Sequence, residues 1–495
     1  MDGLKTEYQL QYKPIKQSTA GMVLLSCMFA GQANGQEKSS KPNVLMILVD
    51  DLNDWIGCMG GNPSIRTPNI DRLASQGLLF TNAHCQAPLS GPSRASLMTG
   101  LRPSTTGIYG MIPDDEIRKA SEATTDVLFL PEYFAKNGYH TMGVGKIFHD
   151  HAPEGVFHES GGRERGFGPI LPDGKRFHWK GGYTQTDWGA FPETDEEMPD
   201  YRTAQWAVNQ LQKKHDRPFF LAAGFLRPHV PWYVPQKWFD MYPAQTVSLP
   251  PYLKGDKDDV PRIAHDMDKM DMMPTTEWAI ANNQWKNMVQ AYLACVSFVD
   301  HYIGEVLRAL EKSEYRDNTI VVLLSDNGYR LGGKDIFAKW CLWQEATKVP
   351  LIISYPAAKK ADVCNEPVEL LDVYPPLLDL CSLPENKTNE GKSLKSIVLG
   401  MSKKSDRSAI STCGRNNHAV VSGNYRYIRY EDFSEELYDH AADPNEWHNI
   451  ANNAENKGIK KQLQKKLPKQ NRWWSVKSEY NINEYYTKQR KEQVK

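Results

Sequence analysis

The chain has 495 residues, enough for about three domains at ~150 residues each, although α/β folds often form larger single units. Hydrophobic residues make up 40% and charged residues 24%, as in ordinary globular proteins. Lys and Arg total 59 and Asp and Glu total 60, a net charge of −1, which argues against a nucleic-acid partner and a polybasic membrane-binding surface. An anionic substrate would therefore need a local basic pocket.

The N-terminal segment resembles a targeting sequence rather than part of a fold. Basic residues precede an apolar run over 20–30, and Ala33 and Gly35 suit the small-residue positions of a signal-peptidase site. We therefore predict a signal peptide over 1–35 and an exported protein, periplasmic or extracellular. The run is too short to span a bilayer, so we expect no transmembrane segment. A lipoprotein anchor at Leu24-Leu-Ser-Cys27 and a disordered extension are the alternatives.

Continuous apolar runs predict strands that are buried on both faces. They are Val44–Val49, Tyr139–Val144, Phe219–Phe225, Thr319–Leu324 and Val349–Tyr355. Helical patterns lie between them, including one that begins at Thr67-Pro68 and ends before Gly77, a second over 131–136 and a long third over 285–310. Strands that alternate with helices predict an α/β fold, with a large, mostly parallel sheet sandwiched by helices.

Two long excursions and a change of pattern divide the chain further. Residues 152–199 and 235–274 are rich in Pro and charge and are typical of surface loops that shape substrate pockets, although purely structural insertions are equally consistent. From residue 385 the pattern predicts a smaller C-terminal α+β domain, with a hairpin around Gly423-Asn424 and a Lys-rich terminal helix. We therefore assign 36–384 to a catalytic domain and 385–495 to a C-terminal subdomain.

The eight cysteines are scattered and show no metal-binding spacing. Cys27 falls in the predicted leader, which leaves seven. A dense disulfide scaffold is excluded, and one or two disulfides remain open. We expect most of these cysteines to be small buried side chains.

Polar and charged side chains follow four of the predicted strands, and ligands in open α/β sheets bind beyond the carboxyl ends of the strands. These side chains are Asp50, Asp51, Lys146, His149, Arg227, His229, Asp326 and Asn327. Asp50, Asp51, Asp326 and Asn327 offer only oxygen ligands, which favours Ca²⁺, with Mg²⁺ as the alternative, over zinc. A helix cap at Asp50-Asp51 and a turn over 326–328 are the competing interpretations of each motif taken alone.

The segment Ser90-Gly-Pro-Ser-Arg-Ala-Ser-Leu-Met-Thr-Gly100 resembles the signature of type I sulfatases. Further motifs extend the resemblance over nearly the whole mature chain, in particular to the iduronate-2-sulfatase-like branch. They are Asp50-Asp-Leu52, Thr67-Pro-Asn-Ile-Asp-Arg-Leu73, Gly145-Lys-Ile-Phe-His149, Arg227-Pro-His-Val-Pro231, Ser325-Asp-Asn-Gly328, Glu436-Leu-Tyr-Asp439 and Asp443-Pro-Asn-Glu446. The resemblance implies an alkaline-phosphatase-like fold and a sulfuric ester hydrolase that removes sulfate from a sulfated carbohydrate.

The resemblance also implies a modified residue at position 90. In the family this residue is oxidised to Cα-formylglycine, and a serine here resembles the substrates of radical-type anaerobic maturases, so a maturase is an expected partner. An engineered Cys→Ser replacement would give the same sequence. Family members of the human type carry His where Asn327 and Lys334 stand here, which leaves the exact substrate open.

Roles for individual residues follow from the resemblance. The metal would be held by Asp50, Asp51, Asp326 and Asn327 together with position 90. Arg94 would bind the aldehyde hydrate, Lys146 and Lys339 the sulfate oxygens. His229 would protonate the leaving oxygen and His149 would deprotonate the second hydroxyl, or the reverse. Lys334 and His418 are further candidates for substrate contact, with a charged loop and an ordinary strand residue as the alternatives.

Two other functions remain open at this point. A phosphomonoesterase or phosphodiesterase of the same superfamily would use Thr or Ser with zinc and needs His ligands near the acidic residues, which this sequence lacks. A non-catalytic protein that binds sulfated glycans would result if Ser90 is never oxidised.

Overall fold

The computed structural model describes residues 41–495 apart from 180–185, 359–360, 402–405, 482 and 493–495. The predicted signal peptide therefore lies outside the described residues. A nine-stranded sheet has the order β10-β2-β9-β8-β1-β6-β3-β4, and β11 also pairs with β2. Its strands are β1 (Asn43–Val49), β2 (Leu78–His84), β3 (His140–Gly145), β4 (Glu159–Gly162), β6 (Phe219–Phe225), β8 (Thr319–Ser325), β9 (Lys348–Ser354), β10 (Asp362–Cys364) and β11 (Val368–Glu369).

The sheet is mostly parallel, as predicted, but the prediction for the fifth apolar run is wrong in direction. β9 pairs antiparallel with both of its neighbours, β8 and β2. β2 was not predicted because Thr81 and Asn82, which are partly exposed, interrupt its apolar run at the position of a register shift.

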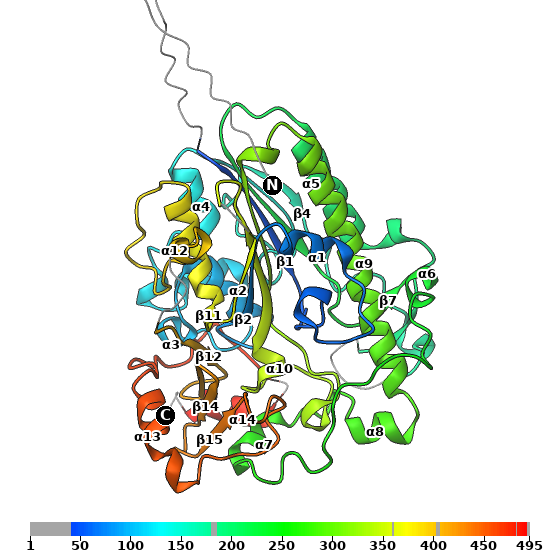
Figure 1. The fold of residues 1–495 in the computed structure, drawn as a ribbon, viewed down its shortest axis with the longest axis vertical. Coiled ribbons are helices and arrows are strands. Elements are labelled where there is room, and N and C mark those ends of the chain that lie inside the picture. The colour runs from blue at the N-terminus through cyan, green and yellow to red at the C-terminus, as the bar shows by residue number, and fades with distance from the viewer. Residues whose placement is uncertain (1–40, 180–185, 359–360, 402–405, 482, 493–495) are drawn as a thin grey trace, which may run out of the picture. The chain divides into compact units, whose positions relative to one another are not determined.

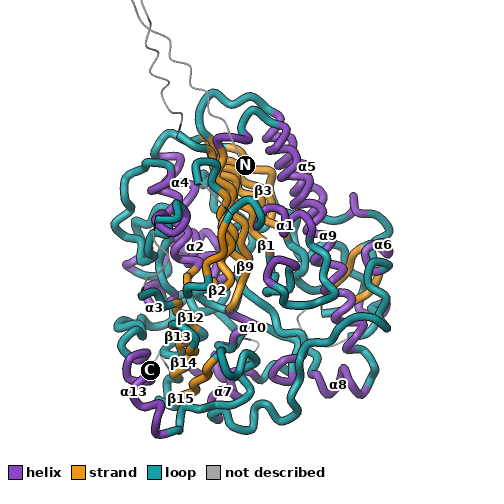
Figure 2. The backbone as a smooth tube through the Cα atoms, in the orientation of Figure 1, coloured by secondary structure: helices purple, strands orange, loops and turns teal. Residues whose placement is uncertain are grey.

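Helices cover both faces of the sheet, and the alternation along β1 shows how (Figures 1 and 2). Leu45, Ile47 and Val49 belong to the core that α1 (Pro68–Ala74), α5 (Pro199–Gln212) and α9 (Trp285–Lys312) close. Val44, Met46 and Leu48 belong to the opposite core, closed by α2 (Ser90–Thr99), α4 (Leu130–Lys136) and α11 (Tyr374–Leu380). Each such side chain contributes about 1.5–3 kcal/mol when it is fully buried. The continuous apolar run therefore reflects burial on both faces.

The helix after Thr67 begins at Pro68, as predicted, but it is shorter than predicted and lacks a side-chain cap. It ends at Ala74 rather than before Gly77, and Thr67 makes no side-chain cap. Its hydroxyl instead donates to Asp71 at 3.1 Å and accepts from the backbone N–H of Gly57 at 2.8 Å. The remaining helices are α3 (Pro103–Thr106), α6 (Gln236–Phe239), α7 (Arg262–Asp268), α8 (Thr276–Ala281), α10 (Gln344–Thr347), α12 (Lys395–Val398), α13 (Lys457–Gln464) and α14 (Glu484–Glu492).

A second, antiparallel sheet lies in the C-terminal part, as predicted, with β12 (Ala409–Thr412), β13 (His418–Ser422), β14 (Tyr425–Arg429) and β15 (Glu435–Asp439) in sequence order. Ser422 pairs with Tyr425 across Gly423-Asn424, and Gly423 has a φ of 56°, which suits the first central position of a tight hairpin. A two-stranded sheet of β5 (Trp188–Ala190) and β7 (Trp232–Val234) joins the first excursion to the segment after β6.

The C-terminal tail is not the solvated helix that its lysines suggested. Tyr480 stacks on Trp340 with ring centroids 4.1 Å apart, and Tyr486 in α14 is 1% exposed and meets Trp340 edge to face. The tail therefore packs against the loop that follows Lys339. The lysine-rich composition of the tail did not predict this contact, because only a few large aromatic rings make it.

Cys58, Cys85, Cys295, Cys341, Cys364, Cys381 and Cys413 are all free thiols. All but Cys58 are buried, so they behave as small apolar side chains. Among the described residues, no helix combines the length and apolarity needed to cross a bilayer.

Candidate active site

Four neighbouring strands deliver the predicted residues to one edge of the sheet. β8, β1, β6 and β3 are adjacent and parallel, so their carboxyl ends lie together. Asp50 and Asp51 follow β1, and Asp326 and Asn327 follow β8. Lys146 follows β3, and His229 lies four residues after β6.

Ser90 lies at the centre of this edge as the first residue of α2, and it is 1% exposed. Its hydroxyl donates to Asp50 Oδ1 at 2.9 Å, and the amide oxygen of Asn327 is 3.3 Å away. The ammonium of Lys339 donates to the Ser90 hydroxyl at 3.3 Å. The helix N-terminus favours an anion at this position because its first N–H groups have no partner within the helix.

Three carboxylates converge beside Ser90 and could hold a metal ion. One oxygen each of Asp50, Asp51 and Asp326 lies within 4.8 Å of the others, and all three residues are fully buried. Asp51 has a φ of 62°, and its Oδ2 has no hydrogen-bond partner. A buried carboxylate oxygen without a partner is costly, and a cation would remove that cost. The oxygen-only ligand set fits a hard cation, Ca²⁺ or Mg²⁺.

Three cationic side chains surround the carboxylates. Arg94 binds Asp326 through Nε at 2.8 Å and approaches Asp50 at 3.4 Å, and it also donates to the carbonyl of Lys146. The ammonium groups of Lys146 and Lys339 pair with Asp50 and Asp51, respectively. The Arg94 guanidinium thus contacts the carboxylates rather than Ser90 itself, so in this geometry it orients the carboxylates of Asp50 and Asp326.

The titration of these groups reflects burial opposed by neighbouring charge. Burial raises the pKa of Asp326 to about 6 although Arg94 opposes the shift. Burial also raises the pKa of Asp50, but neighbouring positive charge, chiefly that of Lys146 together with Arg94, outweighs it and holds that pKa well below its ordinary value. Burial lowers the pKa of Lys146 to about 8 against the charge of Asp50. Buried charges of both signs therefore coexist here only because they are paired.

The two histidines occupy different surroundings. His229 donates from Nδ1 to the carbonyl of Val230 at 2.7 Å, and its Nε2 lies 3.8 Å from Asp51 Oδ2. Burial lowers its pKa well below the ordinary value, which leaves Nε2 as the unprotonated nitrogen at neutral pH. His149 follows Lys146 by three residues, and burial also lowers its pKa. Its Nδ1 is buried and has no hydrogen-bond partner.

Lys334 and His418 are not among the residues that the structure gathers at this edge. Lys334 is 4% exposed and binds Asp256 at 2.6 Å and the carbonyl of Glu446. The ring of His418 is fully buried, with its two nitrogens 3.0 Å from the Thr412 hydroxyl and 2.7 Å from Asn471. Both side chains are occupied by protein partners, which favours the structural alternatives.

Two supporting residues escaped the sequence interpretation. The ring of Phe167 stacks on His229 with centroids 4.5 Å apart and an interplanar angle of 5°, and it also faces the ammonium of Lys146 at 5.9 Å. Trp340, which follows Lys339, is fixed by the C-terminal tail. Neither residue stands in a motif, so only the three-dimensional packing reveals them.

A family assignment agrees with this arrangement of a hydroxyl at a helix N-terminus, three carboxylates and paired cations. The sulfatase family model matches residues 42–383, and a model described as the C-terminal part of N-sulphoglucosamine sulphohydrolase matches residues 332–472. The chain belongs to the sulfatase family.

Relatives that match most of the chain are also sulfatases. A sulfatase of Formosa agariphila is 52% identical, with 95% of each chain covered. The iduronate 2-sulfatase of Mus musculus is 30% identical over 71% of each chain. A solved structure described as a complex with its substrate D-glucosamine-2-N,6-O-disulfate has a TM-score of 0.68, covers 86% of this chain and 97% of its own, and is 23% identical. At that identity the structural match shows the shared fold.

Proposed function

We propose that the protein hydrolyses sulfate esters of a sulfated carbohydrate and that position 90 carries the reacting group. The observation that supports this most directly is the placement of the Ser90 hydroxyl, 2.9 Å from Asp50 and 3.3 Å from the Lys339 ammonium at a helix N-terminus. A group placed there meets both the acidic cluster and the cations that an anionic ester needs. The named substrates of the relatives support the choice of a sulfated sugar.

Two chemical groups complete the proposed site. Oxidation of Ser90 to Cα-formylglycine by an anaerobic-type maturase would supply an aldehyde hydrate with two hydroxyls, one to displace the sugar alcohol from sulfur and one to release the sulfate as the aldehyde re-forms. A Ca²⁺ ion, with Mg²⁺ as the alternative, held by Asp50, Asp51, Asp326 and Asn327 together with position 90, supplies Lewis acidity and positive charge. An unmodified serine lacks the second hydroxyl, so it would stall after one transfer.

The remaining side chains divide the work by position. Lys146 pairs with Asp50 and Lys339 pairs with Asp51. Both ammonium groups supply fixed positive charge for the sulfate oxygens. Arg94 holds the carboxylates of Asp50 and Asp326 in position through ion pairs with both.

The two histidines are proposed to move protons. His229 lies at the rim of the cluster, with its side chain 11% exposed, so it can reach the leaving sugar oxygen once it is protonated. His149 would take the proton from the second hydroxyl. The roles of the two histidines could be exchanged.

Phe167 gives a testable prediction about His229. Phe167→Ala should lower kcat about tenfold on a sugar sulfate, because the imidazole loses the ring that fixes its plane. The loss should be smaller on 4-nitrophenyl sulfate, because a phenolate leaves with less need for a proton. Steady-state rates on both substrates measure this. Phe177→Ala, at a 46%-exposed ring of the same excursion, is the control. Equal losses on the two substrates would contradict a role in protonating the leaving group.

Export, the signal peptide over 1–35 and the maturase as a partner remain parts of this proposal. A predicted leader and a polysaccharide substrate are mutually consistent, because polysaccharides are met outside the cell membrane. The domain division at residue 385 likewise stays a proposal.

The alternatives are separated by one experiment. The protein is coexpressed with a serine-type maturase, the peptide that contains Ser90 is weighed by mass spectrometry, and defined sulfated oligosaccharides are compared with 4-nitrophenyl phosphate as substrates. Loss of two hydrogens at Ser90 together with preferential release of sulfate is the expected result. Faster phosphate release would favour a phosphoester hydrolase. An intact serine with tight glycan binding would favour a non-catalytic binding protein.

A further inference from the structure

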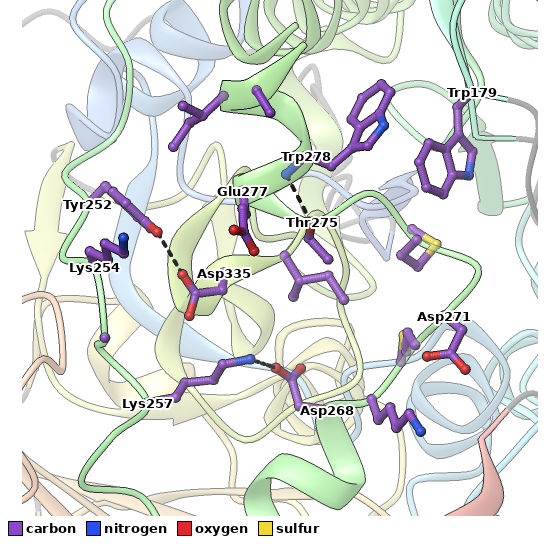
Figure 3. Close-up of a pocket in the computed structure, with 17 residues that line it drawn as sticks. Trp179, Tyr252, Lys254, Lys257, Asp268, Asp271, Thr275, Glu277, Trp278 and Asp335 are labelled. Atoms are coloured by element: carbon purple, nitrogen blue, oxygen red, sulfur yellow. Dashed lines mark hydrogen bonds and ion pairs between the residues drawn. The ribbon is translucent and has the colours of Figure 1, made fainter. Parts of the chain in front are cut away.

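A cavity of about 900 Å³ lies outside the acidic cluster, between the second excursion, α8 and the loop 332–340 (Figure 3). Its lining includes Trp179, Trp278, Glu277, Asp271 and Ile336. The size falls within the range of small-ligand sites, about 300–1,000 Å³. None of these residues takes part in the proposed reaction.

The two tryptophans give the cavity an aromatic wall. Figure 3 shows Trp179 and Trp278 together on one side, and their rings meet edge to face with centroids 5.1 Å apart. Trp179 donates its indole N–H to the carbonyl of Met272 at 3.0 Å, and Trp278 also contacts Trp188. The indole rings are therefore fixed before any ligand binds. A rigid aromatic face suits the C–H face of a sugar ring.

The polar groups of the cavity can bind sugar hydroxyls. Asp271 and Glu277 are exposed in the lining, and Asp335 accepts a hydrogen bond from the Tyr252 hydroxyl at 2.8 Å. Lys257 is paired with Asp268 at 3.1 Å, and Lys254 and Lys269 also line the cavity. The lining therefore carries charges of both signs, and its carboxylates can accept hydrogen bonds from sugar hydroxyls.

The cavity is joined to the active-site edge through the loop 332–340. Ile336 lines the cavity, and Lys339 contacts Ser90 three residues later, so their Cα atoms are at most about 11 Å apart. Arg330 ties the same parts together, because it binds Asp268 of the lining at 2.5 Å and the carbonyl of Lys339 at 3.1 Å. The cavity and the active-site edge therefore share this loop.

We propose that this cavity binds a further sugar ring of the same glycan chain whose sulfate ester lies at Ser90, with the ring against Trp278. This rests on the proposed function and adds that the substrate is an oligosaccharide or polysaccharide rather than a single sugar. The tryptophans supply stacking, and Glu277 and Asp271 accept hydrogen bonds from ring hydroxyls. Substrates that end at the sulfated sugar leave the cavity unused.

The test uses chain length as the variable. Heparin-derived and ulvan-derived disaccharides and tetrasaccharides are titrated by calorimetry into the protein with intact Ser90. The matured enzyme is then assayed on the same sugars and on 4-nitrophenyl sulfate. The parental protein should bind one tetrasaccharide about tenfold more tightly than its disaccharide. Trp278→Ala should remove that difference and raise KM for the tetrasaccharide about tenfold, with 4-nitrophenyl sulfate turnover within about twofold of the parent.

Two further variants keep the result interpretable. Glu277→Gln keeps the shape of the wall and should lose part of the length preference, and Trp473→Ala, at a 57%-exposed indole that does not line the cavity, should keep it. A length preference that survives both Trp278→Ala and Glu277→Gln overturns the inference, as does a parental protein with no length preference. A length preference in a matured protein that releases no sulfate supports the cavity and counts against the proposed function.

Discussion

Ser90→Ala is expected to abolish sulfate release, with a loss of about 10³-fold or more in kcat, because it removes the side chain that is to be oxidised. Ser90 is the residue at which the helix N-terminus, Asp50 and the Lys339 ammonium meet. The lysines, the acidic cluster and the histidines stay in place, so substrate binding should persist while turnover ends. Initial rates of matured protein on 4-nitrophenyl sulfate and on the preferred oligosaccharide measure the effect.

The matched control lies in the same helix. The hydroxyl of Ser96 donates to the carbonyl of Leu101 at 2.6 Å, at the other end of α2. Ser96→Ala should cost about 1 kcal/mol of unfolding free energy and leave kcat within about twofold. A Ser90→Ala variant that keeps about a tenth of the parental rate would contradict the assigned role, since loss of a covalent nucleophile is far more severe.

Asp51→Asn is expected to abolish stabilisation by Ca²⁺ and to reduce turnover by about 10²-fold or more, because it removes charge from the cluster where a buried oxygen has no partner. A ligand that binds only the folded state stabilises it by about 2.7 kcal/mol at 100 times its Kd. The parental protein should therefore gain thermal stability on addition of Ca²⁺ after chelation, whereas the variant should not. Thermal unfolding with and without Ca²⁺ measures this independently of activity.

Asp54→Asn provides the control for charge alone. Asp54 lies three residues further along the chain and pairs with Lys348 at 3.3 Å, outside the cluster. This variant should keep the full Ca²⁺ response. If Asp51→Asn and Asp54→Asn respond alike to Ca²⁺, the cation binds elsewhere and the acidic cluster has another purpose.

The sequence predicted those features that depend on local chemistry. Continuous apolar runs located β1, β6 and β8 closely, and polar residues at their ends marked the edge where Asp50, Asp326 and His229 meet. A strand that is buried on both faces has a continuous apolar run, which can be recognised from consecutive residues alone. The motif around Ser90 supplied the family, which the comparisons then confirmed.

Features that depend on partners distant in the sequence were not predicted. The antiparallel direction of β9 appears only in its pairing with β8 and β2, and β2 was missed because Thr81 and Asn82 break its strand pattern. The ion pairs of Arg94 with Asp50 and Asp326 were not predicted, because only the fold brings these residues within reach. The stacking of Phe167 on His229 joins residues that are separated by β5, α5 and β6, and no spacing rule connects them.

The central claim is that the side chain of residue 90 and a divalent cation act on the same ester. A crystal structure of the matured protein with Ca²⁺, with the ion located by its anomalous scattering, tests this most directly. The account predicts a cation among Asp50, Asp51, Asp326 and Asn327, with an oxygen of residue 90 at about 2.3–2.6 Å from it. A cation bound at another place, or one separated from residue 90 by more than a coordination distance, would contradict it.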